Sequence, residues 1–282
     1  MIERVEIKLK EKMVYRFQYI DFVLIDKELQ LPDDYKNGME ENWSNEIASG
    51  KTYTNGKIYT ISGYNFDNDK KKIYIQQSSY SHYLYSKKRE YDIYSCRSMA
   101  SNALFLTSDN YFVLGKMKNT TSLPGKIKFI GGSVAKEDIN SLNKVDVEEC
   151  IKRECNEEIG IDITDKQYVE NIEPIAYITR THLTFVNTLF CARLWKSKNE
   201  MEKLFKDFQT KLIETNEEVE LQDVVFVHND KESVIEFLEN KDNNLIDYMK
   251  DFFETYFEIS DYGNFDDYVK KHIKEIKVKN EK

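Results

Sequence analysis

The sequence contains few prolines and glycines, and this scarcity argues against long flexible linkers. Only three prolines and ten glycines occur in 282 residues. Neither a low-complexity segment nor an internal repeat is evident. The length suits one large domain, or one ordinary domain with a smaller one. We therefore expect any two domains to lie close together.

Long apolar runs and an excess of basic residues are also missing. No window approaches the ~20 apolar residues of a membrane-spanning helix, and the start, M-I-E-R-V-E-I-K-L-K, lacks the apolar core of a signal peptide. The chain carries 50 acidic and 41 basic residues, a formal charge of −9, which argues against binding DNA or an anionic membrane. We expect a soluble, cytoplasmic protein. The net negative charge does not exclude a local basic pocket for a phosphate group.

Cysteine and histidine are sparse and are not spaced as metal ligands. None of the cysteines forms a C-x-x-C pair, so reduced thiols are expected rather than disulfides or zinc ligands. No two histidines have metal-ligand spacing either. The residues concerned are Cys96, Cys150, Cys155, Cys191, His82, His182, His228 and His272.

The order of apolar patterns predicts two domains. Residues 1–95 have strand patterns at 5–10 and 19–26, a polar helix pattern at 33–47 and a hairpin pattern at 57–76, which together indicate a small mixed α/β domain. A strand, turn and strand then follow in N-A-L-F-L-T-S-D-N-Y-F-V-L-G-K-M, which indicates a new sheet. We place the boundary near Cys96 and assign 96–282 to the second domain, with helices at its C-terminal end.

A tyrosine-rich segment, Tyr74 to Tyr94, precedes that boundary. The favoured interpretation is a strand that packs aromatic rings onto a neighbouring sheet; the alternative is a platform that stacks on a base or sugar. The following K-K-R, Lys87 to Arg89, is expected in a solvated loop.

The stretch R-E-C-N-E-E-I-G-I, Arg153 to Ile161, ends a predicted helix that starts near Val145. On a helical wheel, Glu158 falls inside the apolar half, Glu154 at its edge, and Glu157 just beyond it. Three carboxylates in one place repel each other. Burial also disfavours their charged forms, unless a cation lies beside them.

Arg153 can supply one positive charge, because it precedes Glu157 by one helical turn. Negative charge remains in excess, and carboxylate oxygens without thiolate or imidazole partners are the ligands of Mg²⁺ or Mn²⁺. The alternative is a partly exposed helix with a solvated Glu pair. Gly160 is expected to end the helix in the left-handed conformation.

These residues carry a resemblance to the Nudix hydrolases. Arg153 to Ile161 resembles the second half of the Nudix box, R-E-U-x-E-E-x-G-U, where U is aliphatic. Upstream, P-G-K-I-K-F-I-G-G, Pro124 to Gly132, is similar to the family's P-G-x-W-x-F-P-G-G. The resemblance covers roughly residues 98–257.

The chain departs from the family pattern ahead of the helix. Asp138 stands at the position of the first box glutamate, and fourteen residues instead of seven separate it from Arg153, which indicates an insertion at about 139–144. Ile127 and Ile130 replace the usual tryptophan and proline. Glu154, Glu157 and Glu158 still match the glutamate positions of the family pattern.

The resemblance implies a fold, a site and a reaction. The fold would be α+β, a Nudix-type α/β/α sandwich with a mixed sheet, preceded by the smaller α+β domain. Glu154, Glu157 and Glu158 would bind Mg²⁺ or Mn²⁺ with a backbone carbonyl of Gly131 or Gly132, and Arg153 would orient them. The enzyme would then hydrolyse a diphosphate linked to another group.

Two further roles follow from the chemistry. One glutamate must act as general base: either Glu154 or a residue of T-N-E-E-V-E-L, in which Glu217, Glu218 and Glu220 are candidates and Glu218 is our choice. A solvated turn is the alternative for these three. Arg180 is a candidate for substrate phosphate, or else an ordinary surface residue.

The substrate class is predicted as a small nucleotide, with nucleotide sugars such as UDP-glucose or ADP-ribose first. A weaker similarity to UDP-sugar-hydrolysing Nudix proteins favours them, and an added domain could recognise a second moiety. The alternatives are a non-catalytic sensor of a nucleotide sugar, and a dinucleoside polyphosphate or mRNA-cap hydrolase. A homodimer is one option for the assembly.

Overall fold

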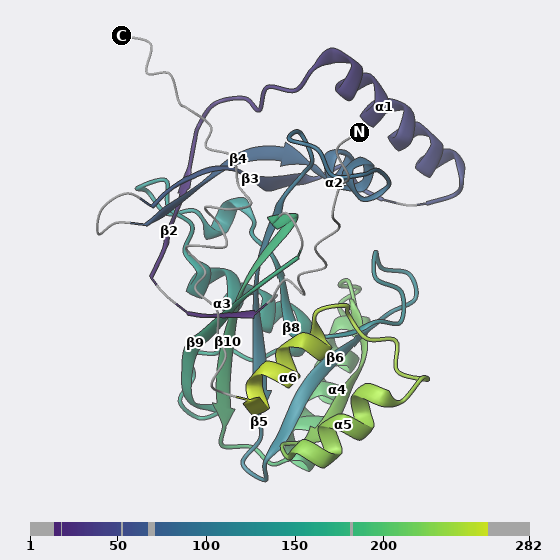
Figure 1. Cartoon of the computed structure of the whole chain (residues 1–282). Coiled ribbons are helices and arrows are strands. Elements are labelled where there is room, and N and C mark those ends of the chain that lie inside the picture. The colour runs from purple at the N-terminus through teal and green to yellow at the C-terminus, as the bar shows by residue number, and fades with distance from the viewer. Residues whose placement is uncertain (1–13, 18, 52, 67–70, 181–182, 259–282) are drawn as a thin grey trace, which may run out of the picture.

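The computed structural model describes residues 14–17, 19–51, 53–66, 71–180 and 183–258 (Figure 1). Within these ranges the strands join into one mixed sheet, whose longest path runs β1-β9-β10-β5-β3-β4-β2. The strands are β1 (Val14–Arg16), β2 (Asp21–Leu24), β3 (Lys57–Asn65), β4 (Lys72–Ser79), β5 (Ser98–Leu106), β6 (Tyr111–Met117), β7 (Ile127–Lys128), β8 (Ile130–Ser133), β9 (Val169–Thr179), β10 (Phe185–Leu194) and β11 (Leu221–His228).

Strand β5 is the centre of this sheet, because it pairs with β10 in parallel and with β3, β6 and β8 in antiparallel. The predicted hairpin at 102–117 is confirmed: Phe105 pairs with Val113 across the β5–β6 turn. Asn110 closes that turn with a φ of 68°, a conformation that asparagine tolerates better than most residues.

Helices cover both faces of the sheet. The helical elements are α1 (Asp33–Ala48), α2 (Tyr80–Lys87), the short 3-10 turn η1 (Lys136–Asp138), α3 (Val147–Ile159), α4 (Lys198–Glu214), α5 (Lys231–Glu239) and α6 (Met249–Glu258). Figure 1 shows α1 and α2 beside β3 and β4, and α4, α5 and α6 around β5 and β6.

Alternating residues of β5 divide the core between the two faces. Ala103 and Phe105 pack in one cluster with residues of α3 and α4, whereas Leu104 and Leu106 pack in another with residues of α5 and α6. This alternation is the period of a strand buried on both faces. The predicted fold class, α+β with a mixed sheet between helices, is confirmed.

The N-terminal strands continue the same sheet. Thr60 of β3 pairs with Ser98 of β5, and Val14 of β1 pairs with Ile178 of β9. The helix expected at 33–47 is confirmed as α1, whereas the strand expected at 5–10 lies outside the described residues. The domain boundary near residue 95 stays a prediction.

The tyrosine-rich segment differs from the favoured interpretation. Strand β4 ends at Ser79, and the chain then forms α2 instead of a longer strand. Ser79 causes this change of structure, because its side chain caps α2 by accepting from the His82 N–H at 3.4 Å. Lys87 is consequently the last residue of a helix and not part of a loop.

The insertion before α3 packs on β2. The Leu24 N–H donates to the Asn143 carbonyl at 2.7 Å, and the Lys144 ammonium donates to both carboxylate oxygens of Asp21 at 2.9 Å. The insertion thus connects an N-terminal strand with the chain that enters α3.

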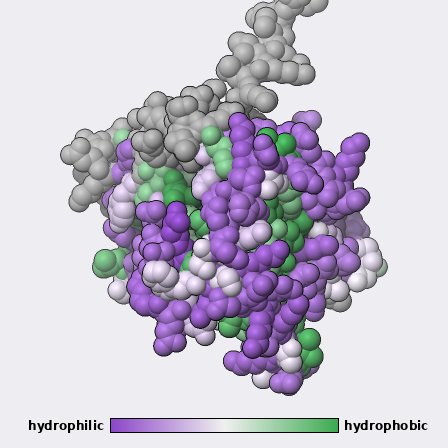
Figure 2. Space-filling view, turned by 90° about the horizontal axis from the view of Figure 1, so that it is seen from below, coloured by the Kyte–Doolittle hydropathy of each residue, from purple (hydrophilic) through white to green (hydrophobic). Residues whose placement is uncertain are grey.

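The surface is mainly hydrophilic, as the composition predicts. Seen from below, hydrophobic residues gather only in small areas between hydrophilic side chains (Figure 2). In the described part of the chain, no helix combines the length and the apolarity needed to cross a membrane.

Candidate functional site

Helix α3 carries the three glutamates and is fixed at both ends. Asp146 caps its start by accepting from the Glu148 and Glu149 N–H groups at 3.1 Å. Gly160 ends it with a φ of 68°, which confirms the expected left-handed cap. A Cβ at Gly160 would lie 2.5 Å from the Phe208 ring, so the close approach of α4 also requires glycine here.

The three glutamates differ in burial in the order that the helical wheel predicts. The side chain of Glu158 is 2% exposed, that of Glu154 12%, and that of Glu157 58%. The alternative of a solvated pair therefore fits Glu157 alone.

Glu158 has protein partners on both carboxylate oxygens. The Lys128 ammonium lies 2.6 Å from Oε1, and the Gly131 N–H donates to Oε2 at 2.8 Å. Burial alone would lower the pKa of Lys128, but Glu158 and, less strongly, Glu154 raise it above its usual value. A charged lysine thus neutralises the most buried glutamate.

Sequence reasoning missed Lys128. The signal that could have found it is its place between two apolar residues of a buried strand, Ile127 and Phe129, where a lysine needs an anionic partner.

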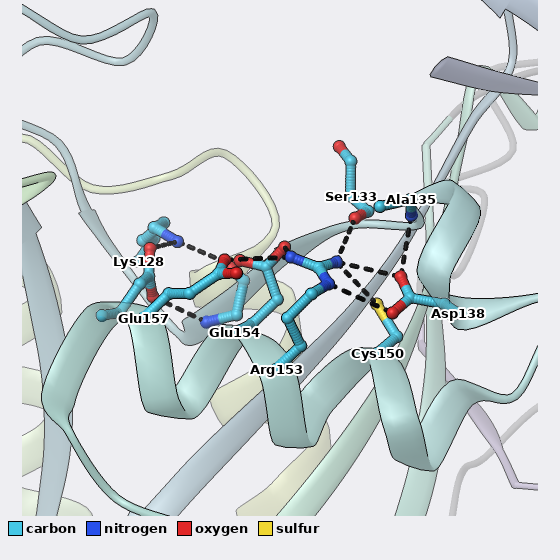
Figure 3. A network of polar contacts seen from close by, with 10 residues as sticks. Lys128, Ser133, Ala135, Asp138, Cys150, Arg153, Glu154 and Glu157 are labelled. Atoms are coloured by element: carbon cyan, nitrogen blue, oxygen red, sulfur yellow. Dashed lines mark hydrogen bonds and ion pairs between the residues drawn. The ribbon is translucent and has the colours of Figure 1, made fainter. Parts of the chain in front are cut away.

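Arg153 links the other two glutamates to Asp138 (Figure 3). Its Nη1 donates to Glu154 Oε1 at 2.8 Å and to Glu157 Oε2 at 3.0 Å. Its Nε and Nη2 donate to the two oxygens of Asp138 at 3.1 and 2.9 Å, and Nη2 also reaches the Ser133 carbonyl at 3.1 Å. The planar guanidinium thereby fixes two carboxylates on one side and is itself fixed on the other.

The insertion leaves this contact of Asp138 intact. Asp138 is buried and accepts from the Ala135 N–H at 2.7 Å. The inserted loop closes on itself, because Ile139 pairs with Val145 and the Asp146 N–H donates to the Asp138 carbonyl at 2.7 Å. The backbone at Asp146, where α3 begins, therefore lies next to Asp138 despite the inserted residues.

Glu154 lies against Gly132 of strand β8. A Cβ at Gly132 would collide with the Glu154 carboxylate, and Gly131 has a φ of 130°, so each position needs glycine. Burial raises the pKa of Glu154 to about 7; Glu158 adds to this shift, and Arg153 opposes it. This carboxyl group can exchange a proton near neutral pH.

A cavity of about 680 Å³ adjoins these residues. Its lining includes Lys128, Gly131, Gly132 and Glu154, as well as side chains of α2. The volume lies within the range of roughly 300–1,000 Å³ that is typical of small-molecule sites.

The candidates from the later loop separate in the structure. Glu217, Glu218 and Glu220 are all exposed, but of the three only Glu220 is among the cavity-lining residues. Desolvation by the surrounding protein atoms and, next, the negative charge of Glu158 raise the pKa of Glu220. Of the glutamates in T-N-E-E-V-E-L, the one that lines the cavity is therefore Glu220 and not Glu218, which we chose from the sequence.

Arg180 also lines the cavity. Its Nε and Nη2 donate to the two oxygens of Asp247 at 2.8 Å each. Its guanidinium stacks over the rings of Phe185 and Tyr248, at 5.0 and 5.6 Å from their centroids. Arg180 is therefore held rigidly at the wall of the cavity.

A divalent cation fits the donor chemistry of this site. Arg153 occupies one oxygen of Glu154 and one of Glu157, so the second oxygen of each remains for a hard cation. In the described ranges, no three Asp, Glu, His or Cys side chains already converge as metal ligands.

Comparison with known proteins gives only distant likenesses. No family profile and no curated protein matches the chain. Among solved structures, a NUDIX hydrolase from Nitrosomonas europaea is 11% identical, with a TM-score of 0.34 over 58% of this chain and 91% of that one. The protein DR0079 from Deinococcus radiodurans is 12% identical, with a TM-score of 0.35 over 63% and 83%.

A bifunctional NMN adenylyltransferase/ADP ribose pyrophosphatase from Francisella tularensis is also similar. It is 9% identical, with a TM-score of 0.37 over 61% of this chain and 44% of that one, so this chain spans less than half of its length. At these identities and TM-scores, the likenesses do not assign the chain to a family.

Proposed function

We propose that this protein is a Nudix-type hydrolase that cleaves the diphosphate bond of a nucleoside diphosphate linked to another group, with Mg²⁺ or Mn²⁺ as cofactor. The observation that carries the proposal is the pair of carboxylates, Glu154 and Glu157, that Arg153 holds together; Glu154 also lines the cavity. The resemblance of R-E-C-N-E-E-I-G-I to the second half of the Nudix box supports the same proposal.

The metal would be held by the glutamates of α3, with the backbone carbonyl of Gly132. When bound, it would neutralise the diphosphate and lower the pKa of a water molecule. Glu154, Glu157 and Glu158 are the proposed ligands. Arg153 keeps two of them in place, and Asp138 fixes Arg153 from behind.

The proton-accepting role falls to a carboxyl group with a pKa near the working pH. Glu154 has a pKa raised to about 7, and Glu220 also has a raised pKa and lines the cavity. Among the candidate bases, the cavity and the raised pKa values therefore favour Glu154 and Glu220, and Glu218 remains the third candidate. Arg180 is the proposed phosphate-binding residue.

A nucleotide sugar such as UDP-glucose or ADP-ribose is the proposed substrate. The cavity volume of about 680 Å³ is compatible with a ligand of this kind. The tyrosines of α2 in its lining, Tyr80 and Tyr83, support a ligand with a ring to contact them.

The test compares Glu157→Gln with Glu149→Gln. Both glutamates lie on α3, and their side chains are 58% and 59% exposed, so neither change should affect folding. The wild type is incubated with UDP-glucose, ADP-ribose, a dinucleoside polyphosphate, a capped RNA and a nucleoside triphosphate, with Mg²⁺ or Mn²⁺.

We expect wild-type cleavage of a sugar nucleotide, a loss of at least about 100-fold in kcat for Glu157→Gln, and no loss for Glu149→Gln. Mn²⁺ affinity, measured by calorimetry, should fall in the first variant only. Full activity in EDTA, or equal activity of both variants, would contradict the proposal. Binding of a sugar nucleotide without cleavage would favour the sensor instead.

A further inference from the structure

Not every basic side chain in the lining of the cavity is paired with a carboxylate. Among the described residues, Arg89 pairs with Asp92, Lys128 with Glu158, and Arg180 with Asp247, while Glu154 and Glu220 also line the cavity. The other two basic residues are Lys87 and Lys126.

These two lysines differ in what they contact. The Lys126 ammonium donates to the Asn244 side chain at 3.3 Å and to the Leu245 carbonyl at 3.1 Å, so it is held by neutral acceptors. The Lys87 ammonium lies 5.3 Å from the centre of the Tyr83 ring and forms no ion pair with the described residues. Lys87 is thus the cation that the fold leaves available.

The pKa of Lys87 depends on Arg180, a residue that is distant from it in the sequence. Burial and, next, the positive charge of Arg180 lower the pKa of Lys87. Arg180 also acts on Tyr83, where it opposes the rise in pKa that burial causes. Lys87, Tyr83 and Arg180 all line this cavity, and the Lys87 ammonium lies over the Tyr83 ring. Asp247, the partner of Arg180, opposes the effect of Arg180 on Lys87, and a bound anion would compensate the positive charge further.

We propose that Lys87 and Arg180 form an anion subsite beside Tyr83 that holds a phosphate group of the substrate without a metal ion. This inference deepens the proposed function, because it assigns recognition of the nucleotide's phosphate to a residue among the first 95. Arg180 supplies a preoriented planar donor, and Lys87 supplies a mobile point charge.

The reach of α2 into the cavity explains why this subsite would select a nucleotide over free phosphate. Tyr80 and Tyr83 line the same cavity as Lys87, and their ring centroids are 5.7 Å apart. A phosphate at Lys87 places the attached nucleoside or sugar beside these rings, which offer apolar faces for it.

The experiment measures binding in EDTA, so that the glutamates and metal do not contribute. Wild type, Lys87→Met and Lys88→Met are titrated by calorimetry with UDP-glucose, ADP-ribose, inorganic diphosphate and uridine. Lys88 is the matched control: it is adjacent, carries the same charge and ion-pairs with Glu46, but it does not line the cavity. Thermal melts verify that both variants are folded.

We expect wild-type affinity for UDP-glucose or ADP-ribose that weakens with added salt, with little affinity for uridine. Lys87→Met should bind about 10- to 100-fold more weakly, the loss typical of one charge-assisted hydrogen bond, and Lys88→Met should bind as the wild type does. Equal affinity of the two variants, or no metal-free binding by the wild type, would overturn the subsite.

The result separates this inference from the proposed function. If Lys87→Met keeps its affinity while the wild type hydrolyses a sugar nucleotide with Mg²⁺, the subsite fails and the hydrolase stands. If binding depends on Lys87 but nothing is hydrolysed, the hydrolase fails and the subsite stands.

Discussion

Replacing Lys128 with methionine removes the ammonium that neutralises Glu158. The Glu158 side chain is 2% exposed, and only the Gly131 N–H would remain bonded to it. Breaking one partner of a buried ion pair costs about 3–5 kcal/mol, because the other charge stays desolvated. We therefore expect the free energy of unfolding at pH 7 to fall by about 3–5 kcal/mol.

Burial, and not the length of the ion pair, sets this magnitude. Lys206 and Glu202 on α4 are also 2.6 Å apart, but their side chains are 67% and 41% exposed. Lys206→Met removes an equally short ion pair, yet it should cost far less, because water already solvates both charges. The difference between the two variants isolates the effect of burial.

Urea unfolding at pH 7 measures both variants, together with the double variant Lys128→Met/Glu158→Gln. Because the double variant leaves no buried charge behind, it should be more stable than Lys128→Met alone. A cost below about 1 kcal/mol for Lys128→Met, or a double variant no more stable than the single one, would refute the reasoning.

Three further predictions concern the same network. The pKa of Glu154 is raised to about 7 from a usual 4.5. In EDTA, the folded state therefore holds one more proton than the unfolded state between pH 4.5 and 7. As pH rises through this range, the contribution of Glu154 to the free energy of unfolding should fall by up to about 3 kcal/mol. Urea unfolding across this range should show no such fall for Glu154→Gln, and an equal fall would contradict the assignment. Gly132→Ala should lose about 1–3 kcal/mol and most activity, since its Cβ meets Glu154; Gly56→Ala, whose Cβ meets nothing within 4 Å, is the control. Asp138→Asn should lower kcat more than it raises KM, because Arg153 would lose the anionic partner that holds it on the side away from Glu154 and Glu157; an unchanged kcat would show that Asp138 does not position Arg153.

Local periodicity predicted the part of the site that lies on one helix. The positions of Glu154, Glu157 and Glu158 follow from 3.6 residues per turn, and the cap at Gly160 follows from the residue type. Burial of Glu158 could also be predicted, because its neighbours on the wheel are apolar.

Contacts between distant segments could not be predicted in this way. Lys128 is 30 residues before Glu158, and no local pattern pairs them. Asp138 keeps its contact with Arg153 only because the inserted loop closes on itself, and this closure depends on backbone pairing. The same limit explains α2, where Ser79 starts a helix that brings Lys87 to a cavity built from other parts of the chain.

The pairing of β1 with β9 sets an order of events during synthesis. Val14 pairs with Ile178, so an N-terminal strand must wait until the ribosome has made the residues of its partner. At about 5–20 residues per second, this wait is roughly 10–30 s. Tyr15 belongs to the same core cluster as Tyr177, and until β9 emerges it has no such neighbour. The nascent chain thus exposes an unpaired strand throughout this interval, which makes the segment prone to non-native pairing until β9 is made.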